Sequence, residues 1–523
     1  MENPAAVWPT ISILVLNYNS LDHLPTNLDA LHALDYPADK LEILLIDNDS
    51  TDGSVAWVAA HYPQVELVQN GANLGFAGGN NAGVLAATGE WVAILNPDVR
   101  VRPDWLRELI RPFQQDPSIS CIASKMLNWD GTAVDFADAA LNFMGWGNQP
   151  GLGSPDSDQF DISKPFLFAC GGAMLIRRDV FLEVGGFDPD YFAYFEDVDL
   201  GWRLWLLGHK VIYAPRAVAY HRHHGSWETV SNAKRWLLAE RNTLYTICKN
   251  YDETHLAYIL PAALLLVLQR AFLDVRPDPA HFGLPPAGPK TYLSYYVYEV
   301  WQMIRNGRLL ELGQRGIEEV KRRLERLSPD YTPMVPQEQP SQPPQNGRFP
   351  VPAVTLSRLL AGHDVAHHWP NLWVKRQQLQ AHRQRSDHQI FPLFQEPLLS
   401  NFGDIQFIYA MNQAIAKFKL VKLFGPTGKL PDITPEVQSL SQTVSGHLLQ
   451  LMAQAFALSQ VDENLLRLNG PDPQPVYNVP EQSVAILAHA NQWLWTLPNG
   501  DLATVLTYLQ TEIAAWQAKG SAV

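Results

Sequence analysis

The chain has 523 residues, which exceeds the usual size of one hydrophobic core, so we expect two or three domains. Hydrophobic residues make up 46% of the chain and charged residues 18%, a composition typical of globular and not of disordered proteins. The formal net charge of −14 argues against nucleic acid as a partner, and a phosphorylated substrate would need a cation or a local cluster of donors beside it.

Short apolar runs alternate with helix-like segments in the first hundred residues. The helix-like segments include Leu24–Leu34 and Ser54–His61. This alternation predicts an α/β fold with a parallel, wound sheet, in which ligands bind beyond the carboxyl ends of the strands. The predicted strands are Ile11–Leu16, Leu41–Ile46, Val65–Val68 and Trp91–Leu95.

Further along the chain, Asp197–Leu207 has its leucines on one helical face and precedes Gly208, so we predict a helix followed by a strand over Lys210–Ala214. Leu256–Leu268 is the longest stretch without a charged or amide side chain. It is shorter than the roughly 18–20 residues that span a bilayer. We therefore expect a buried helix, with a helix lying at the membrane interface as the alternative.

Composition predicts four regions. An α/β domain over residues 8–245 is followed by a helical extension over 246–327, which is membrane-proximal in the interfacial alternative, and by a Pro- and Gln-rich linker over 328–352. Residues 353–523 read as a mostly helical region of unknown role.

Met1–Pro9 has neither a basic stretch nor a long apolar run, so no signal peptide is expected. The three widely spaced cysteines indicate neither a zinc site nor a disulfide framework, and they fit a reduced, cytoplasmic compartment.

Polar clusters follow three of the predicted strands. Asp47–Ser54 (DNDSTDGS) offers acceptors for a base or a ribose hydroxyl, but the same residues also suit a turn and a helix cap. Asn73–Gly83 (NLGFAGGNNAG) lets the backbone approach a ligand closely, or forms a plain turn. Asp98, in Asn96-Pro97-Asp98, suits Mg²⁺ or Mn²⁺ shared with a diphosphate, although many strand ends carry Asp for turn reasons.

Two later segments carry titratable residues. Glu196–Asp199 places three carboxylates within four residues, directly after the aromatic run Tyr191–Phe195. Desolvation by those rings should raise at least one carboxyl pKa, which suits a general base; the alternative is an acidic first turn that complements the helix dipole. His221–His224 (HRHH) offers an imidazole for a metal and Arg222 for a phosphate, or it is structural.

Taken together and in this order, these segments resemble the family 2 glycosyltransferases, most of all the rhamnosyltransferase-like branch that builds bacterial cell-surface polysaccharides. The resemblance covers roughly residues 10–325. It implies a GT-A fold, which is Rossmann-like, and an inverting mechanism. The segments that carry it are Ile13–Asn19, Leu44–Ser54, Asn73–Gly83, Leu95–Val99, Cys170–Leu204 and Ala219–Ser226.

The resemblance also implies roles for single residues. Asp197, with Glu196 beside it, matches the catalytic base; Asp98 and His221 match ligands of a divalent cation, Mg²⁺ or Mn²⁺. The sequence departs from the family's metal motif at Asn96, where an acid is usual. The residues expected at the nucleotide-sugar are Asn17, Tyr18, Asn19, Asp47, Asn48, Ser50, Asn73, Gly75, Asn80 and Asn96. Those expected at the acceptor are Gly171, Gly172 and Asp199.

The expected function is transfer of a sugar, rhamnose by resemblance, from a nucleotide-diphosphate donor to a hydroxyl of a glycan or lipid-linked acceptor. Such an enzyme would work in the cytoplasm, with peripheral contact to the inner face of the membrane; its oligomeric state is not readable. One alternative is a sugar-phosphate nucleotidyltransferase, although the loop NYNSLDHL after the first strand has no Lys or Arg. The other is a non-catalytic binding or scaffold protein, which Asn96 favours and the intact Glu196–Asp199 run opposes.

Overall fold

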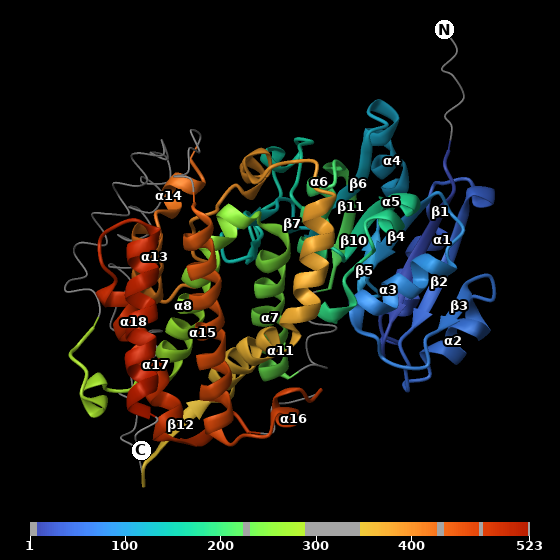
Figure 1. The fold of residues 1–523 in the computed structure, drawn as a ribbon. Coiled ribbons are helices and arrows are strands. Elements are labelled where there is room, and N and C mark those ends of the chain that lie inside the picture. The colour runs from blue at the N-terminus through green and yellow to red at the C-terminus, as the bar shows by residue number, and fades with distance from the viewer. Residues whose placement is uncertain (1–7, 223–230, 288–345, 426–432, 470–473, 521–523) are drawn as a thin grey trace, which may run out of the picture.

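The computed structural model describes residues 8–222, 231–287, 346–425, 433–469 and 474–520. An α/β part and a helical part lie side by side (Figure 1). Several predictions fall outside the described residues: His223 and His224, the N-terminal seven residues, residues 288–327 of the expected extension and residues 328–345 of the expected linker.

The α/β part is built on a nine-stranded sheet whose main path has the order β3-β2-β1-β4-β10-β6-β11-β5, with β7 paired to β6. All four strands predicted near the N-terminus are confirmed, and their apolar side chains are largely buried. The strands are β1 (Ile11–Asn17), β2 (Leu41–Asp47), β3 (Glu66–Gln69), β4 (Trp91–Leu95), β5 (Val99–Val101), β6 (Ile119–Asn128), β7 (Val134–Phe136), β10 (Ala173–Arg177) and β11 (Lys210–His221).

The sheet is mixed, whereas the sequence predicted a parallel one. β1 pairs in parallel with β2 and β4, and β2 with β3, as expected. However, β10 runs antiparallel between β4 and β6, and β11 is parallel to β6 but antiparallel to β5. Strand direction is set by the connections between strands and not by the residues of a strand, so no local sequence signal indicates this reversal.

Helices flank this sheet, and two of them match their predicted ranges closely: α2 (Ser54–His61) and α6 (Glu196–Leu206). Gly208 follows the end of α6 with φ of +94°, a left-handed conformation that glycine adopts without a steric penalty. The other helices of this part are α1 (Leu24–His32), α3 (Gly75–Ala86), α4 (Trp105–Gln115) and α5 (Arg178–Glu183).

The region from residue 353 onward is mostly helical, as predicted. Its long helix α11 packs along α7, and α15 packs against α11 and α8 (Figure 1). One continuous hydrophobic cluster runs through both parts of the molecule. The main helices of the helical part are α7 (Asn232–Asn250) and α8 (Glu253–Val275), which precede this region in the chain, and α11 (Ala353–Ala381), α13 (Ile405–Lys417), α15 (Pro435–Ser459), α17 (Glu481–Thr496) and α18 (Leu502–Gly520) within it.

Two predicted boundaries do not coincide with the elements of the structure. The end of the first region at residue 245 falls inside the continuous helix α7. The last five residues of the expected linker form strand β12 (Arg348–Pro352), which pairs antiparallel with β13 (Val476–Pro480). The Pro-rich composition predicted an irregular segment, but this edge pairing supplies the hydrogen bonds that a two-stranded ribbon needs.

Helix α8 contains the apolar stretch that was weighed as a membrane-interface helix. It has 23 residues and by length and composition alone could cross a bilayer, so it is longer than the apolar run that predicted it. Its most apolar 18-residue window is completely buried by the rest of the protein. The expectation of a buried helix is therefore confirmed, and α8 offers no exposed apolar face for the interfacial alternative.

Candidate functional site

A connected polar cluster lies at the carboxyl ends of β1 and β2. The parallel register places Asn17 directly beside Asp47, and both are buried. The Asn17 side-chain amide donates to Asp47 Oδ1 (2.9 Å), to Ser50 Oγ (3.0 Å) and to Ser54 Oγ (2.8 Å). The structure thus brings together two distant segments that the sequence assigned to the nucleotide-sugar, although the Asn17 amide nitrogen is already used by protein acceptors.

The neighbouring residues at these strand ends are more open. Tyr18 is half-buried, whereas Asn19 is exposed and has a left-handed backbone with φ of +53°. The Asn19 backbone N–H donates to Ser50 Oγ (3.0 Å), and its side-chain oxygen accepts from the Thr51 N–H (2.8 Å). These bonds tie the loop after β1 to the loop after β2, so the two loops form one surface.

The glycine-rich segment joins this cluster through Asn48. The Asn48 side chain donates to the Gly75 carbonyl (2.9 Å), and the Gly75 N–H donates to Asn73 Oδ1 (2.9 Å). Asn80, one turn into α3, is buried and donates to the Phe76 carbonyl (3.0 Å). The segment therefore packs against the strand ends, and its contact with a donor stays a prediction.

We expect Gly75→Ala to disturb this region more than an alanine at another left-handed glycine. Gly75 has φ of +71°, and an added Cβ would lie 2.4 Å from the Phe192 carbonyl oxygen. Gly53 has φ of +83° with nothing within 4 Å, so Gly53→Ala is a control for backbone strain alone. Thermal unfolding should give a loss of about 1 kcal/mol for the control and about 2–4 kcal/mol for Gly75→Ala. Equal losses would contradict the close approach to Phe192.

Asp98 and His221 meet at the edge of the sheet. The antiparallel pairing of β11 with β5 places His221 opposite Val99, the residue after Asp98. His221 Nε2 lies 3.4 Å from Asp98 Oδ2, and both side chains are largely buried. Burial lowers the pKa of His221, but the bonds to Asp135 and Asp98 outweigh it and raise that pKa to about 10. The two residues predicted to bind a cation are therefore adjacent.

Asp135 is a member of this cluster that sequence reasoning missed. Its Oδ2 lies 2.6 Å from His221 Nδ1, the ring nitrogen that faces away from Asp98. A carboxylate on the far nitrogen fixes the orientation of a histidine, an arrangement common around metal-binding imidazoles. Asp135 is a single acid in the short strand β7, with no motif around it, so nothing in the sequence pointed to it. Arg222, weighed earlier for a phosphate, instead lies over the Trp129 ring, 4.8 Å from its centroid.

Glu196 and Asp197 begin helix α6. Asp197 Oδ2 accepts from the Gly171 N–H (3.0 Å), and Oδ1 accepts from the Val198 N–H (2.8 Å). Burial raises the pKa of Asp197, and burial together with the charge of Asp197 raises the pKa of Glu196 well above its usual range. Glu196 Oε2 is buried, and no hydrogen-bond partner for it occurs among the described residues. The raised pKa values that the aromatic run suggested are therefore present.

The segment Cys170–Gly172 connects the two groups of carboxylates. The Asn96 N–H donates to the Gly172 carbonyl (3.0 Å), one residue from the Gly171 N–H that binds Asp197. Burial and the charges of Asp197, Asp135 and Glu196 raise the pKa of the Cys170 thiol. The strand end that precedes Asp98 and the first turn of α6 therefore both contact this segment.

The expectation that Asp199 contacts an acceptor is wrong. Its side chain is fully buried and forms ion pairs with Arg203 (2.8 Å) and Lys249 (3.0 Å), while Asn250 donates to it at 3.0 Å. Burial would raise the pKa of Asp199, but the two cations lower it, so the carboxylate stays ionised inside the protein. Asp199 therefore anchors α6 and is also excluded as an alternative base. The acceptor contacts of Gly171 and Gly172 stay predictions.

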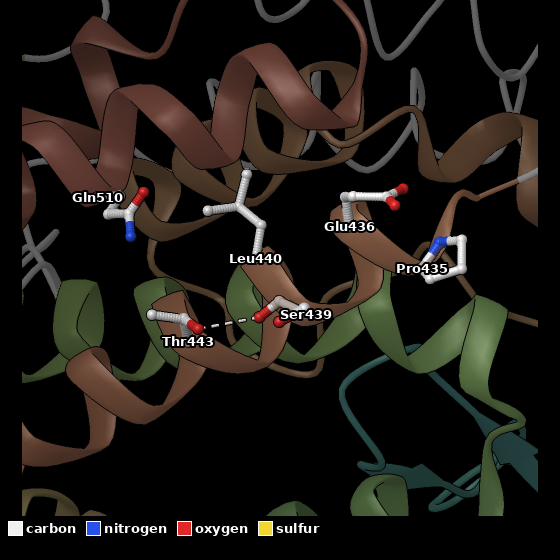
Figure 2. Close-up of a pocket in the computed structure, with 6 residues that line it drawn as sticks. All are labelled: Pro435, Glu436, Ser439, Leu440, Thr443 and Gln510. Carbon is white, nitrogen blue, oxygen red and sulfur yellow. Dashed lines mark hydrogen bonds between the residues drawn. The ribbon is translucent and has the colours of Figure 1, made fainter.

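A shallow hollow elsewhere on the surface has no comparable chemistry. Figure 2 shows its lining on α15 and α18, where the Thr443 hydroxyl donates to the Ser439 carbonyl. The hollow carries one carboxylate and no basic or aromatic side chain, so we do not assign a reaction to it. Its lining residues are Pro435, Glu436, Ser439, Leu440, Thr443 and Gln510.

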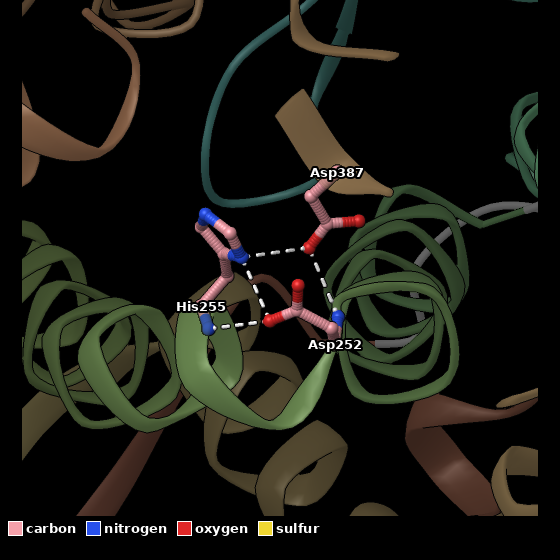
Figure 3. Close-up of side chains that lie close together, drawn as sticks. All are labelled: Asp252, His255 and Asp387. Atoms are coloured by element: carbon pink, nitrogen blue, oxygen red, sulfur yellow. Dashed lines mark hydrogen bonds and ion pairs between the residues drawn. The ribbon is translucent and has the colours of Figure 1, made fainter. Parts of the chain in front are cut away.

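A second group with metal-type ligands joins α8 to the C-terminal region. Figure 3 shows His255 Nδ1 facing two carboxylates, Asp252 Oδ1 at 2.7 Å and Asp387 Oδ2 at 3.1 Å. Asp387 also forms an ion pair with Arg383. Because one ring nitrogen serves both carboxylates and a guanidinium lies beside them, we interpret the group as a buried ion-pair network.

This network predicts a pH-dependent stability. Burial lowers the pKa of His255, but the bonds to Asp252 and Asp387 outweigh it and raise the pKa from 6.5 to about 9. The stabilisation is therefore complete below pH 6.5 and is lost as the pH rises through about 9, a change of up to about 3 kcal/mol. The unfolding temperature of His255→Gln should lie well below that of the unchanged protein at pH 6. The two unfolding temperatures should approach each other at pH 9.5. A gap that does not change with pH would contradict this prediction.

Comparison with known proteins supports the sequence resemblance. The family model "Glycosyl transferase family 2" matches residues 12–185. An N-acetylglucosaminyl-diphospho-decaprenol L-rhamnosyltransferase of Mycobacterium tuberculosis is 30% identical over 241 residues, which cover 41% of this chain and 77% of that protein. A low-salt glycan biosynthesis hexosyltransferase of Haloferax volcanii is 26% identical over 199 residues, which cover 37% of this chain and 61% of that protein.

Solved structures with a similar arrangement show weaker likeness. GalNAc-T7 with UDP, GalNAc and Mn²⁺ has 18% identity and a TM-score of 0.40, over 49% of this chain and 51% of that chain. A mannosyltransferase from Pyrobaculum calidifontis, in complex with GDP-Man and Mn²⁺, has 20% identity and a TM-score of 0.33, over 46% of this chain and 66% of that chain.

Proposed function

This chain belongs to the family 2 glycosyltransferases, and we propose that it moves a sugar from a nucleotide-diphosphate donor to a hydroxyl of a glycan or lipid-linked acceptor. Its expected GT-A fold and its role as a glycosyltransferase in glycan biosynthesis follow from that membership. Rhamnose is the proposed sugar, because the relative from Mycobacterium tuberculosis is named as an L-rhamnosyltransferase. The observation that carries the proposal is that Asn96, two residues before Asp98, and the carboxylate of Asp197 bond to the neighbouring residues Gly172 and Gly171.

Asp197 is the proposed base. Its carboxylate is partly buried at the start of α6, where two backbone N–H groups hold it in one orientation. Burial raises its pKa, which makes the carboxylate a stronger proton acceptor than an exposed one. We propose that it takes the proton of the acceptor hydroxyl while that oxygen attacks the anomeric carbon from the side opposite the diphosphate. This geometry inverts the configuration at that carbon.

The residues around Asp98 fit a divalent cation. Asp98 provides a carboxylate oxygen, and His221 provides an imidazole nitrogen 3.4 Å from that oxygen. Asp135 contacts the other ring nitrogen of His221 and holds the orientation of the ring. These ligand types suit Mn²⁺ or Mg²⁺, and two protein ligands leave positions for diphosphate oxygens. A cation bound there supplies positive charge that offsets the negative charge of the leaving diphosphate and of the surrounding acids. Asn96, which replaces an acid of the family motif, bonds to the Gly172 carbonyl through its backbone and keeps the loop in place.

The other functions considered from the sequence lose their support at this point. Family membership favours consumption of an activated sugar over its synthesis, so a nucleotidyltransferase is not proposed. A purely binding or scaffold role does not account for two carboxyl groups with raised pKa values at the start of one helix. Peripheral membrane contact and a cytoplasmic location remain predictions.

A thermal-shift screen tests the donor. Nucleotide-sugars with uridine, guanosine and deoxythymidine bases would be added with and without Mn²⁺, because a ligand that binds only the folded state raises the unfolding temperature. We expect the largest shift for dTDP-rhamnose, and only when Mn²⁺ is present. Shifts of equal size with a chelator would remove the metal role, and a larger shift for another donor would replace rhamnose in the proposal.

A further inference from the structure

The chain immediately before the proposed base has a strained backbone. Phe192, Tyr194 and Phe195 have φ angles of +64°, +72° and +66°, a region that residues other than glycine rarely occupy. Such conformations cost free energy and persist only where the surrounding structure enforces them. Phe195 directly precedes Glu196 and Asp197, so whatever holds this segment also sets the position of the two carboxylates.

Helix α7 holds the carbonyl groups of the strained segment. The buried side chain of Asn242 donates to the carbonyls of Tyr191 (3.0 Å), Ala193 (2.8 Å) and Tyr194 (2.8 Å). Arg241 Nη2 donates to the carbonyls of Asp190 (2.8 Å) and Tyr191 (3.1 Å). These bonds hold the backbone of residues 190–194. The start of the segment, at Asp188 and Pro189, is held by other contacts.

Helix α11 holds the start of the segment. This helix belongs to residues 353–523, the region to which the sequence assigned no role. Lys375 Nζ lies 2.6 Å from Asp188 Oδ1 and 2.6 Å from Asp190 Oδ2. Asn371, one turn earlier on α11, donates to the same Asp190 oxygen at 3.0 Å. Lys249 of α7 binds the other oxygen of Asp188 at 2.7 Å. The two acids that bracket Pro189 are therefore held between α7 and α11, two helices that lie far apart in the sequence.

The charges in this contact are well matched. Asp188 is buried, which would raise its pKa, but the charges of Lys249 and Lys375 hold that pKa well below its usual range. Burial lowers the pKa of Lys375, and the charges of Asp188 and Asp190 outweigh it and raise that pKa. Both partners are thus ionised at neutral pH. A half-buried lysine shared by two carboxylates holds their separation more firmly than a solvent-exposed pair would.

We propose that Lys375 is a positioning residue for the reaction and that helix α11 makes the C-terminal region part of the catalytic unit. Lys375 binds Asp188 and Asp190 and so holds the turn that they form. The position of this turn sets the direction of the chain through Phe195, and thereby places Asp197 beside Gly171. Lys375 itself need not touch either substrate. The inference rests on the proposed function in one respect only, namely that Asp197 is the base.

Hydrogen–deuterium exchange on the full chain tests the positioning without any substrate. Lys375→Met removes the charge, Lys375→Arg keeps it, and Lys422→Met makes the same change at an exposed lysine of the same region. We expect faster exchange in peptides covering residues 188–199 for Lys375→Met only, with peptides from β1 and β4 unchanged. Unchanged exchange at 188–199, or acceleration of equal size throughout the sheet, would overturn the inference.

The same variants are then assayed for release of dTDP from dTDP-rhamnose with Mn²⁺. We expect about a 10-fold lower kcat for Lys375→Met, with the KM for the donor within about 2-fold, because misplacement of a catalytic group affects turnover more than binding. Lys375→Arg should recover most of the loss. A lower kcat for Lys375→Met without recovery by arginine, or an equal loss for Lys422→Met, would contradict a positioning role.

Two further outcomes separate this inference from the proposed function. If the unchanged protein releases no nucleoside diphosphate from any donor of the thermal-shift screen, the proposed function fails, and the exchange experiment still decides whether Lys375 orders residues 188–199. If Lys375→Met does not fold, Asn371→Ala replaces it, because Asn371 is exposed and contributes one bond to Asp190. Faster exchange in the same peptides then supports the inference, and unchanged exchange overturns it.

Discussion

Asp197→Asn is expected to lower turnover on the order of 10²–10⁴-fold while leaving donor binding intact, because it removes the proposed base but keeps its shape. An amide can still accept the Gly171 N–H that now binds Asp197 Oδ2. It cannot take a proton from the acceptor hydroxyl. The measurement is the rate of nucleoside diphosphate release under saturating donor, beside the donor affinity from thermal shift.

The control for this prediction is Asp158→Asn, which makes the same chemical change at an exposed residue. It should leave both the rate and the affinity unchanged. Glu196→Gln provides a second comparison, because Glu196 is the buried neighbour whose charge adds to that of Asp197. Near-normal turnover by Asp197→Asn together with a large loss in Glu196→Gln would transfer the role of base to Glu196.

The pH dependence of the same reaction has a defined sign. Burial raises the pKa of Asp197, and a base is active only when it is ionised. The rate should therefore rise with pH through a pKa above that of an ordinary aspartate, and this acidic limb should disappear in the residual activity of Asp197→Asn. An identical acidic limb in that variant would assign the titration to another group.

Asp98→Ala is expected to lower the rate of transfer severely, with no recovery at high Mn²⁺, because it removes the carboxylate that is proposed to hold the cation. Oxygen from Asp98 and nitrogen from His221 are the two ligands that the structure places together. Excess chelator should have the same effect on the unchanged protein, reversed by adding Mn²⁺. The loss is on the order of 10²–10³-fold or more, the usual contribution of charge stabilisation at a leaving group.

Asp135→Asn separates the metal interpretation from a purely structural one. Asp135 orients His221 through the 2.6 Å contact between Asp135 Oδ2 and His221 Nδ1. Removing such a carboxylate typically weakens metal affinity about 10–100-fold. Asp135→Asn should therefore recover activity as Mn²⁺ is raised, whereas Asp98→Ala should not. If Mn²⁺ restored activity in both variants, or in neither, the result would contradict the assigned roles.

Much of the α/β part could be predicted because its signals are local. The run Trp91–Leu95 coincides with β4, and Ser54–His61 coincides with α2. Short buried strands rich in β-branched residues and a helix with a clear start and stop are readable one segment at a time. The reversed direction of strand β10 could not be predicted in this way, since it depends on the residues that connect β10 to β6 and to α5.

The candidate site shows the same division. Asp98, Asp197 and His221 were found because the order of the motifs resembles one family. Asp135 and Lys375 lie on unremarkable segments and become visible only when the fold brings them to His221 and to Asp188. Asp199 was misassigned for the opposite reason: it stands in an acidic motif, but its position along α6 turns it inward, to Arg203 and Lys249.

Anomalous diffraction from a crystal soaked with Mn²⁺ and dTDP would show whether Asp98 and Asp197 serve one reaction centre. We expect a manganese peak at Asp98, beside the diphosphate, with the open side of the sugar site facing Asp197. Manganese bound instead among Asp252, His255 and Asp387, or dTDP bound far from Asp98, would contradict this expectation.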